Sequence, residues 1–226
     1  MLYHKAYELL KNSDSPKLMP DLCANLGDAY VFDNDLPKAA LWYRKALFIA
    51  DSLQLPKVQN ASLYMGLGRI YLLLEDFEAS LNCYQQTEKS FSDLSLNLQA
   101  YFLNNYGNYY YYTKDYQTSL KKFLMLKKLL EKHDKRETFS MYLCKLNLAD
   151  VYLNLNQLDL SDKCLDEVED YMRKNGDETA IYYCNTIRIG QAVKKKDWNT
   201  VARILAGEKS NDQLDFSLLQ IRHQYL

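Results

Sequence analysis

A five-residue motif recurs four times along this 226-residue chain, at nearly constant spacing. The four copies are Leu26-Gly27-Asp28-Ala29-Tyr30, Leu67-Gly68-Arg69-Ile70-Tyr71, Tyr106-Gly107-Asn108-Tyr109-Tyr110 and Leu148-Ala149-Asp150-Val151-Tyr152. Their small second positions lie 41, 39 and 42 residues apart. Self-similarity at such a period is typical of proteins built from stacked repeats, so the repeat limits the possible folds more strongly than composition does.

A second pattern follows each motif after a short polar turn. It places a small residue four positions before a large apolar one, and the four small residues are Ala39, Ser80, Ser119 and Ser161. Spacing by three and four residues predicts amphipathic helices. We therefore expect each unit to be two antiparallel helices, whose small residues let the backbones approach. Three aspartates in the turns are predicted to cap the second helices: Asp35, Asp76 and Asp115.

Together the two patterns resemble the tetratricopeptide repeat, whose consensus is W-x2-L-G-x2-Y followed by A-x3-F. The resemblance covers nearly the whole chain. The units depart from the consensus, because they exceed the family length of ~34 residues and most lack the closing proline. The tryptophan is also replaced, by Cys23, Tyr64, Leu103 and Lys145. The resemblance implies an all-α fold, a right-handed α-α superhelix of stacked antiparallel helix pairs. The lengthened units are similar to those of bacterial signalling and transcriptional regulators.

We expect a single solenoid over residues 1–226. It begins on the second helix of a partial repeat, continues through four repeats and a weak fifth, and closes with an unpaired helix. The respective segments are 1–16, 18–54, 57–94, 96–134, 137–175, 178–208 and 211–226. Neither end carries the polar cap with which solenoids shield their last apolar face. We therefore expect a segment of a larger protein, with more repeats or an output domain beyond Leu226, and the uncapped ends allow a homodimer.

Composition argues against several classes of partner. The formal net charge of −1 argues against direct nucleic-acid binding by this segment, which would need a basic excess. No stretch approaches the ~20 apolar residues of a membrane span, so we expect no membrane contact by this segment. The five cysteines are far apart, which favours free thiols in a reducing compartment. A cytoplasmic location is expected, and the periplasmic sensor region of a membrane-anchored regulator is the alternative.

The sequence predicts no enzyme, metal or cofactor. The three histidines, His4, His133 and His223, are isolated from one another, and no pair has the spacing of helical metal ligands. The Asp33-Asn34-Asp35 turn lacks the central glycine and closing glutamate of a calcium loop. Gly66 and Gly68 lie in a helical pattern without the strand and turn that a phosphate loop needs.

A binding surface is predicted instead on the first helix of each unit, because these helices line the concave face of a solenoid. The candidate residues are Asp28, Phe32, Met65, Arg69, Tyr101, Asn104, Asn108, Tyr111, Tyr112 and Asp150. Asparagine amides can bond an extended peptide backbone, and tyrosines supply rigid contact area. The family resemblance implies such roles for Asn108 and Arg69, although its full carboxylate clamp is not matched. Tyr111 and Tyr112 serve equally well as core, and Arg69 equally well as a salt bridge to a neighbouring repeat.

Our first hypothesis for function is a protein- or peptide-binding module, the sensor or interaction region of a bacterial transcriptional regulator. The regulatory part rests on analogy of fold. A passive scaffold for a multiprotein complex is the alternative. An effector domain beyond Leu226 would favour the regulator. A third hypothesis, a catalytic domain with an unfamiliar site, would need several buried ionisable groups gathered in one pocket.

Overall fold

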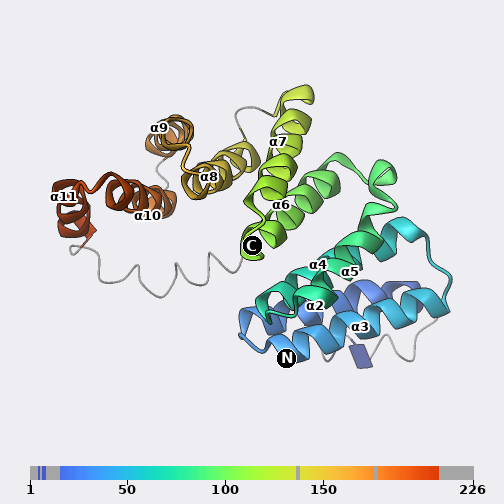
Figure 1. The fold of residues 1–226 in the computed structure, drawn as a ribbon. Coiled ribbons are helices and arrows are strands. Elements are labelled where there is room, and N and C mark those ends of the chain that lie inside the picture. The colour runs from blue at the N-terminus through green and yellow to red at the C-terminus, as the bar shows by residue number, and fades with distance from the viewer. Residues whose placement is uncertain (1–4, 6, 9–15, 136–137, 176–177, 209–226) are drawn as a thin grey trace. The chain divides into compact units, whose positions relative to one another are not determined.

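The computed structural model describes residues 5, 7–8, 16–135, 138–175 and 178–208, and in that part of the chain all regular structure is helical (Figure 1). The α-helices are α2 (Met19–Phe32), α3 (Leu36–Ser52), α4 (Lys57–Leu73), α5 (Phe77–Glu88), α6 (Leu96–Tyr112), α7 (Tyr116–Lys132), α8 (Phe139–Asn154), α9 (Leu158–Asn175), α10 (Glu178–Lys195) and α11 (Trp198–Glu208). Two short 3-10 helices are η1 (Pro16–Leu18) and η2 (Phe91–Asp93). The predicted all-α class is confirmed. The predicted unpaired helix at 211–226 and most of the partial repeat at 1–16 lie outside the described residues.

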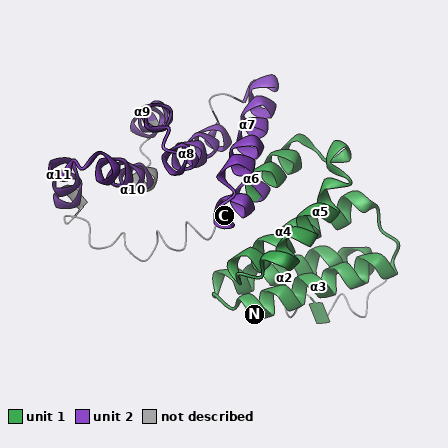
Figure 2. Cartoon of the chain, in the orientation of Figure 1, with its two compact units in different colours: residues 1–105 green, residues 106–226 purple. Residues whose placement is uncertain are grey.

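The chain divides into two compact units, residues 1–105 and 106–226 (Figure 2). In the first unit α2 packs against α3, α3 against α4, and α4 against α5. In the second unit α7 packs against α8, α8 against α9, and α10 against both α9 and α11. Helix α6 begins in the first unit and ends in the second. Consecutive helices are therefore neighbours in space within each unit, as expected of a helical repeat.

In most of the turns inside the helix pairs, an aspartate caps the second helix, whereas Gln157 takes this place before α9. The carboxylate of Asp35 accepts a hydrogen bond from the amide of Lys38, at 3.2 Å. Asp76 and Asp115 make the same bond, each at 3.1 Å, to Ala79 and Thr118 respectively. The three predicted N-caps are confirmed, and Asp197 at the start of α11 is a fourth.

The residue before each of these aspartates has a left-handed backbone. The φ angles are 57° at Asn34, 59° at Glu75, 63° at Lys114 and 58° at Lys196. This conformation ends the first helix, because the next amide turns back to a carbonyl of the helix that it leaves. The amide of Asp35, for example, donates to the carbonyl of Tyr30 at 2.8 Å.

Small residues mark the closest approach within each helix pair. A Cβ added to Gly27 would lie 2.5 Å from the Tyr43 ring, and one added to Gly107 would lie 2.7 Å from the Phe123 ring. The opposing serines also make a bond that the repeat pattern did not predict. The Oγ atom of each donates to the carbonyl oxygen of the small residue in the first helix. The pairs are Ser80 with Gly68 at 2.8 Å, Ser119 with Gly107 at 2.9 Å, and Ser161 with Ala149 at 2.7 Å.

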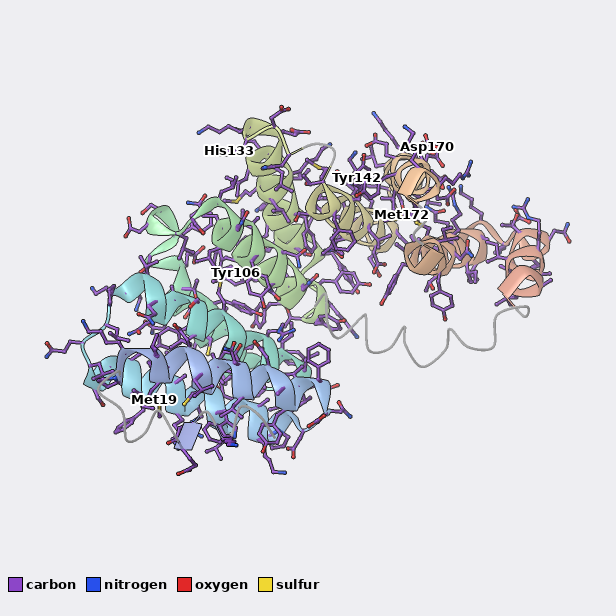
Figure 3. The ribbon with its side chains drawn as sticks, turned by 180° about the vertical axis from the view of Figure 1, so that it is seen from behind. Met19, Tyr106, His133, Tyr142, Asp170 and Met172 are labelled. Atoms are coloured by element: carbon purple, nitrogen blue, oxygen red, sulfur yellow. The ribbon has the colours of Figure 1, made fainter. Side chains whose placement is uncertain are left out.

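Each unit has its own apolar core. The cluster in the first unit joins α2, α3, α4 and α5 through side chains such as Cys23, Tyr43 and Ile70. The cluster in the second unit joins α8, α9 and α10, and includes Tyr142 and Met172 (Figure 3). None of the described helices is long and apolar enough to cross a membrane.

Candidate ligand-binding surface on the first helices

Three side chains from three helices of the first unit form a polar cluster. We call Asp28 of α2, Tyr43 of α3 and Arg69 of α4 the first-unit cluster. The Tyr43 hydroxyl donates to Oδ1 of Asp28 at 2.8 Å, and Nη2 of Arg69 lies 3.3 Å from the same oxygen. The helical repeat explains why Asp28 pairs with Arg69. Each residue directly follows the small residue of its motif, and the two motifs belong to successive repeats.

The guanidinium of Arg69 is buried but incompletely paired. Its side chain is 11% exposed, whereas that of Asp28 is 45% exposed. Its Nε atom is buried and has no hydrogen-bond partner. A guanidinium carries five N–H donors, and buried donors are normally satisfied. Arg69 can therefore bond an additional acceptor.

Electrostatics keep this arginine charged and the neighbouring tyrosine neutral. Burial alone would lower the pKa of Arg69, but the nearby phenol of Tyr101 and carboxylate of Asp28 raise it above its ordinary value. Burial, and then the negative charge of Asp28, raises the pKa of Tyr43. Tyr43 thus remains a hydrogen-bond donor, and Arg69 remains a cation that can attract an anionic group.

The other predicted residues of the first unit differ widely in exposure. Phe32 at the end of α2 and Tyr101 on α6 are exposed. Met65 of α4 is fully buried, and Asn104 of α6 is buried. Phe32, Tyr101 and Asp28 therefore contribute accessible surface, and Arg69 lies just below it. The structure adds Tyr43, which the sequence pattern indicated only as a core aromatic.

In the second unit, another polar group joins α6 to α8. The Tyr111 hydroxyl is hydrogen-bonded to Asp150, and burial, followed by the charge of Asp150, raises its pKa. The Nδ2 atom of Asn154 donates to Tyr111 at 3.3 Å and to the carbonyl of Asp150 at 2.9 Å. Tyr111 thus bridges two helix pairs and has a polar partner at its tip. Tyr112 is partly buried and contacts Tyr111 edge to face.

Asn108 of α6 lies in the second unit and is buried, and its Nδ2 atom has no hydrogen-bond partner. A free amide donor there can bond a carbonyl oxygen. Arg69 in the first unit and Asn108 in the second are therefore buried donors with unused capacity. Among the described residues, no group of three or more His, Cys, Asp or Glu side chains could hold a metal ion.

Comparison with known proteins agrees with this architecture. The sequence model of the tetratricopeptide repeat matches residues 61–87, which lie in α4 and α5. Tetratricopeptide-like repeats of a putative kinesin light chain from Podosopora anserina superpose with a TM-score of 0.69 and 11% identity, covering 89% of this chain and 100% of that one. The chain therefore contains a match to the tetratricopeptide repeat at residues 61–87 and has the fold of tetratricopeptide-like repeats.

Two further solved structures share the fold of this chain. Aspartyl phosphate phosphatase F from Bacillus subtilis has a TM-score of 0.73 and 14% identity, covering 92% of this chain and 54% of that one. A Rap protein complexed with competence and sporulation factor has a TM-score of 0.73 and 15% identity, covering 99% of this chain and 61% of that one. This chain thus spans less than two thirds of the length of either. No curated protein sequence matches it significantly.

Proposed function

We propose that this chain binds a protein or peptide segment on the first helices of its repeats, and serves as the interaction or sensor region of a bacterial regulator. One observation supports the binding site above all others. Arg69 is a buried cation with a single 3.3 Å ion pair and an unpartnered Nε. Leaving a buried charge incompletely paired is costly, and an acceptor from a ligand would remove that cost.

The chemistry of the first-unit cluster indicates what part of a ligand it would bind. A carboxylate, from a side chain or a peptide terminus, matches the planar donor geometry of a guanidinium. The exposed rings of Phe32 and Tyr101 offer apolar contact area on the same unit. In the second unit, taken by itself, the free amide of Asn108 can bond a carbonyl oxygen.

The regulatory role is supported by likeness of fold. The Rap protein of similar fold is complexed with competence and sporulation factor, so this arrangement of helices can present a surface to a regulatory ligand. The likeness concerns the fold alone, and the ligand of the present chain is proposed from its own residues.

Selection from a displayed library of random 12-residue peptides tests the binding site. We expect the selected peptides to carry a carboxylate that is required for binding. Arg69→Gln should weaken their binding at least about tenfold, because it removes a buried charge partner. Asp28→Asn breaks the same internal ion pair but keeps the guanidinium, and should preserve binding or strengthen it.

Arg173→Gln is the matched control, because this arginine has a 72% exposed side chain on α9. Peptides that bind wild type, Arg69→Gln and Arg173→Gln equally would disprove the proposed site. If Arg69→Gln and Asp28→Asn lose peptide affinity to the same extent, the internal ion pair supports the fold and Arg69 does not contact the peptide.

A further inference from the structure

Helix α7, the second helix of its pair, exposes a face that lies outside the candidate binding surface on the first helices. We call Lys121, Leu124, Met125, Lys128 and Lys132 the α7 outer face. The three lysines are exposed, and Leu124 and Met125 are 41% and 50% exposed. The opposite side of the helix is core, because Ser119, Phe123, Leu126 and Leu130 are buried. Two apolar side chains therefore lie between lysines on the outer side of a packed helix.

The lysines of this face are poorly compensated by the acidic side chains that the structure describes, although the charge of Lys121 helps to lower the pKa of Asp115 at the start of the helix. Among the described residues, neither Lys121, Lys128 nor Lys132 forms an ion pair, whereas the neighbouring Lys127 lies 4.0 Å from Glu131. Lys122 is also engaged, with its ammonium 4.2 Å from the centre of the Tyr106 ring. Lys132 stands in the last turn, just before His133 (Figure 3), where a cation favours the helix dipole. That benefit does not extend to Lys121 or Lys128.

Helix α9 in the same unit shows the contrasting arrangement. It is rich in acidic side chains, but most of them are paired with cations from adjacent helices. Arg188 of α10 contacts Asp166 at 2.7 Å and Glu169 at 2.6 Å, and Lys145 of α8 contacts Glu167 at 2.8 Å. The fold thus neutralises charge where charge has only a structural role. Among the described residues, the three lysines of the α7 outer face form no such ion pair, and Lys128 and Lys132, one turn apart on the helix, repel each other.

We propose that the α7 outer face docks an acidic amphipathic segment of a partner protein. Acidic side chains of the segment would pair with Lys121, Lys128 and Lys132, and one or two apolar side chains would cover Leu124 and Met125. The face extends over eleven residue steps, about 16 Å along the helix. Three turns of a partner helix match that length.

Charge and shape favour a protein over other anionic partners. Nucleic-acid surfaces are usually more extensively basic, whereas this chain has a net charge of −1. A membrane-bound helix needs a continuous apolar face, and here only two exposed apolar side chains stand among the lysines. Complementary charge around a small apolar centre is instead the arrangement of a protein interface.

A titration followed by nuclear magnetic resonance tests the proposal. The probe is a blocked 14-residue peptide of glutamates with two leucines four positions apart. Its glutamine analogue is the uncharged comparison. We expect shifts concentrated on α7, loss of binding with the glutamine peptide, and weaker binding as salt rises. The titration is repeated in Arg69→Gln, so that binding at the first-unit cluster is separated from binding at α7.

Two variants of the face and one control complete the experiment. Lys121→Gln/Lys128→Gln and Leu124→Ser/Met125→Ser should each weaken binding roughly tenfold while circular dichroism stays unchanged. Lys163→Gln/Lys174→Gln makes the same charge change on exposed positions of α9 and should have no effect. Equal binding by wild type and both face variants would overturn the proposal. Tighter binding of vesicles with phosphatidylserine, or of double-stranded DNA, at the same residues would also overturn it.

Discussion

Tyr43 of α3 lies directly against Gly66 of α4, so closely that a Cβ on the glycine would be 2.2 Å from the tyrosine ring. The ring cannot move aside freely, because it is buried and its hydroxyl is bonded to Asp28. Gly66 therefore sets the distance between two helices and holds Tyr43 in the first-unit cluster.

The first prediction concerns this contact. Gly66→Ala should destabilise the protein by about 1–3 kcal/mol through overpacking, even though alanine is the better helix former. Gly68→Ala is the comparison, because its new Cβ would meet Cys83 at 3.1 Å, a milder contact. Urea denaturation of both variants measures the difference. A Gly66→Ala variant as stable as wild type would mean that the ring yields without cost.

The sequence predicted the helix pairs and their caps because these depend on local spacing. An aspartate at a turn can bond only the amides that follow it, so Asp35, Asp76 and Asp115 were identified correctly. The serine bonds were missed, because Ser80 and Ser119 fit the pattern as small residues, and size alone does not indicate where a hydroxyl points. The contact of Gly66 with Tyr43 was missed for a related reason: it joins two successive repeats.

The exposure and the partners of the candidate surface residues were harder to predict from the sequence. Helical register gives the angle at which a side chain leaves its own helix, but not which side chain of another helix covers it. Met65 and Arg69 share a face of α4 at a spacing of four, yet Met65 is fully buried and Arg69 retains an unpartnered Nε. A salt bridge from Arg69 to a neighbouring repeat was one of the two predicted roles, but its partner was not. The partner is Asp28, because residues one period apart lie at the same level of adjacent first helices.

The second prediction uses two serines with the same backbone bond. Ser119→Ala removes one buried hydrogen bond and should cost about 0.5–1.5 kcal/mol. Ser161→Ala should cost about 1 kcal/mol more, because Nε2 of the buried Gln191 donates to Ser161 at 2.8 Å and would lose its acceptor. Thermal and urea denaturation of the two variants give the comparison. Equal costs would indicate that water or another group satisfies Gln191.

The third prediction concerns the left-handed turn residues. Glu75 has a φ of 59°, which is unfavourable for a side chain of its type and costs a glycine little. Glu75→Gly should stabilise the protein by about 0.5–1 kcal/mol, net of the greater chain entropy of glycine when unfolded. Asn34→Gly is the control, since asparagine already tolerates this conformation and should gain less. A loss of stability in Glu75→Gly would show that the glutamate side chain contributes elsewhere.

The fourth prediction is a dependence of stability on pH. Hydrogen bonds from Thr118 and Thr200 lower the pKa values of Asp115 and Asp197, and a bond with Lys38 lowers that of Asp35. A depressed folded-state pKa adds stability above the unfolded pKa of about 4, and this stability is lost as pH falls through the folded value. The melting temperature should therefore drop below about pH 4.

Replacing the three caps with asparagine isolates their share of this drop. Asparagine caps helices about as well as aspartate but does not titrate. Asp35→Asn/Asp115→Asn/Asp197→Asn should melt near the wild-type temperature at pH 7 and lose less between pH 5 and pH 3. If the two proteins lose stability in parallel over that interval, other carboxylates cause the acid sensitivity.

The fifth prediction concerns Arg188, which joins α10 to three carboxylates of α9. Its guanidinium lies 2.6 Å from Glu169, 2.7 Å from Asp166 and 3.5 Å from Asp162, and its side chain is 26% exposed. Arg188→Met keeps an apolar stem but leaves these acids to repel one another. The unfolding free energy should fall by about 1–3 kcal/mol at low salt, and the deficit should shrink in 1 M NaCl as the repulsion is screened.

Arg173→Met is the control. It removes a more exposed, 3.5 Å contact with the same Glu169 and should change the unfolding free energy by less than about 0.5 kcal/mol. A deficit in Arg188→Met that is unchanged by salt would assign the contribution to packing of the stem rather than to charge.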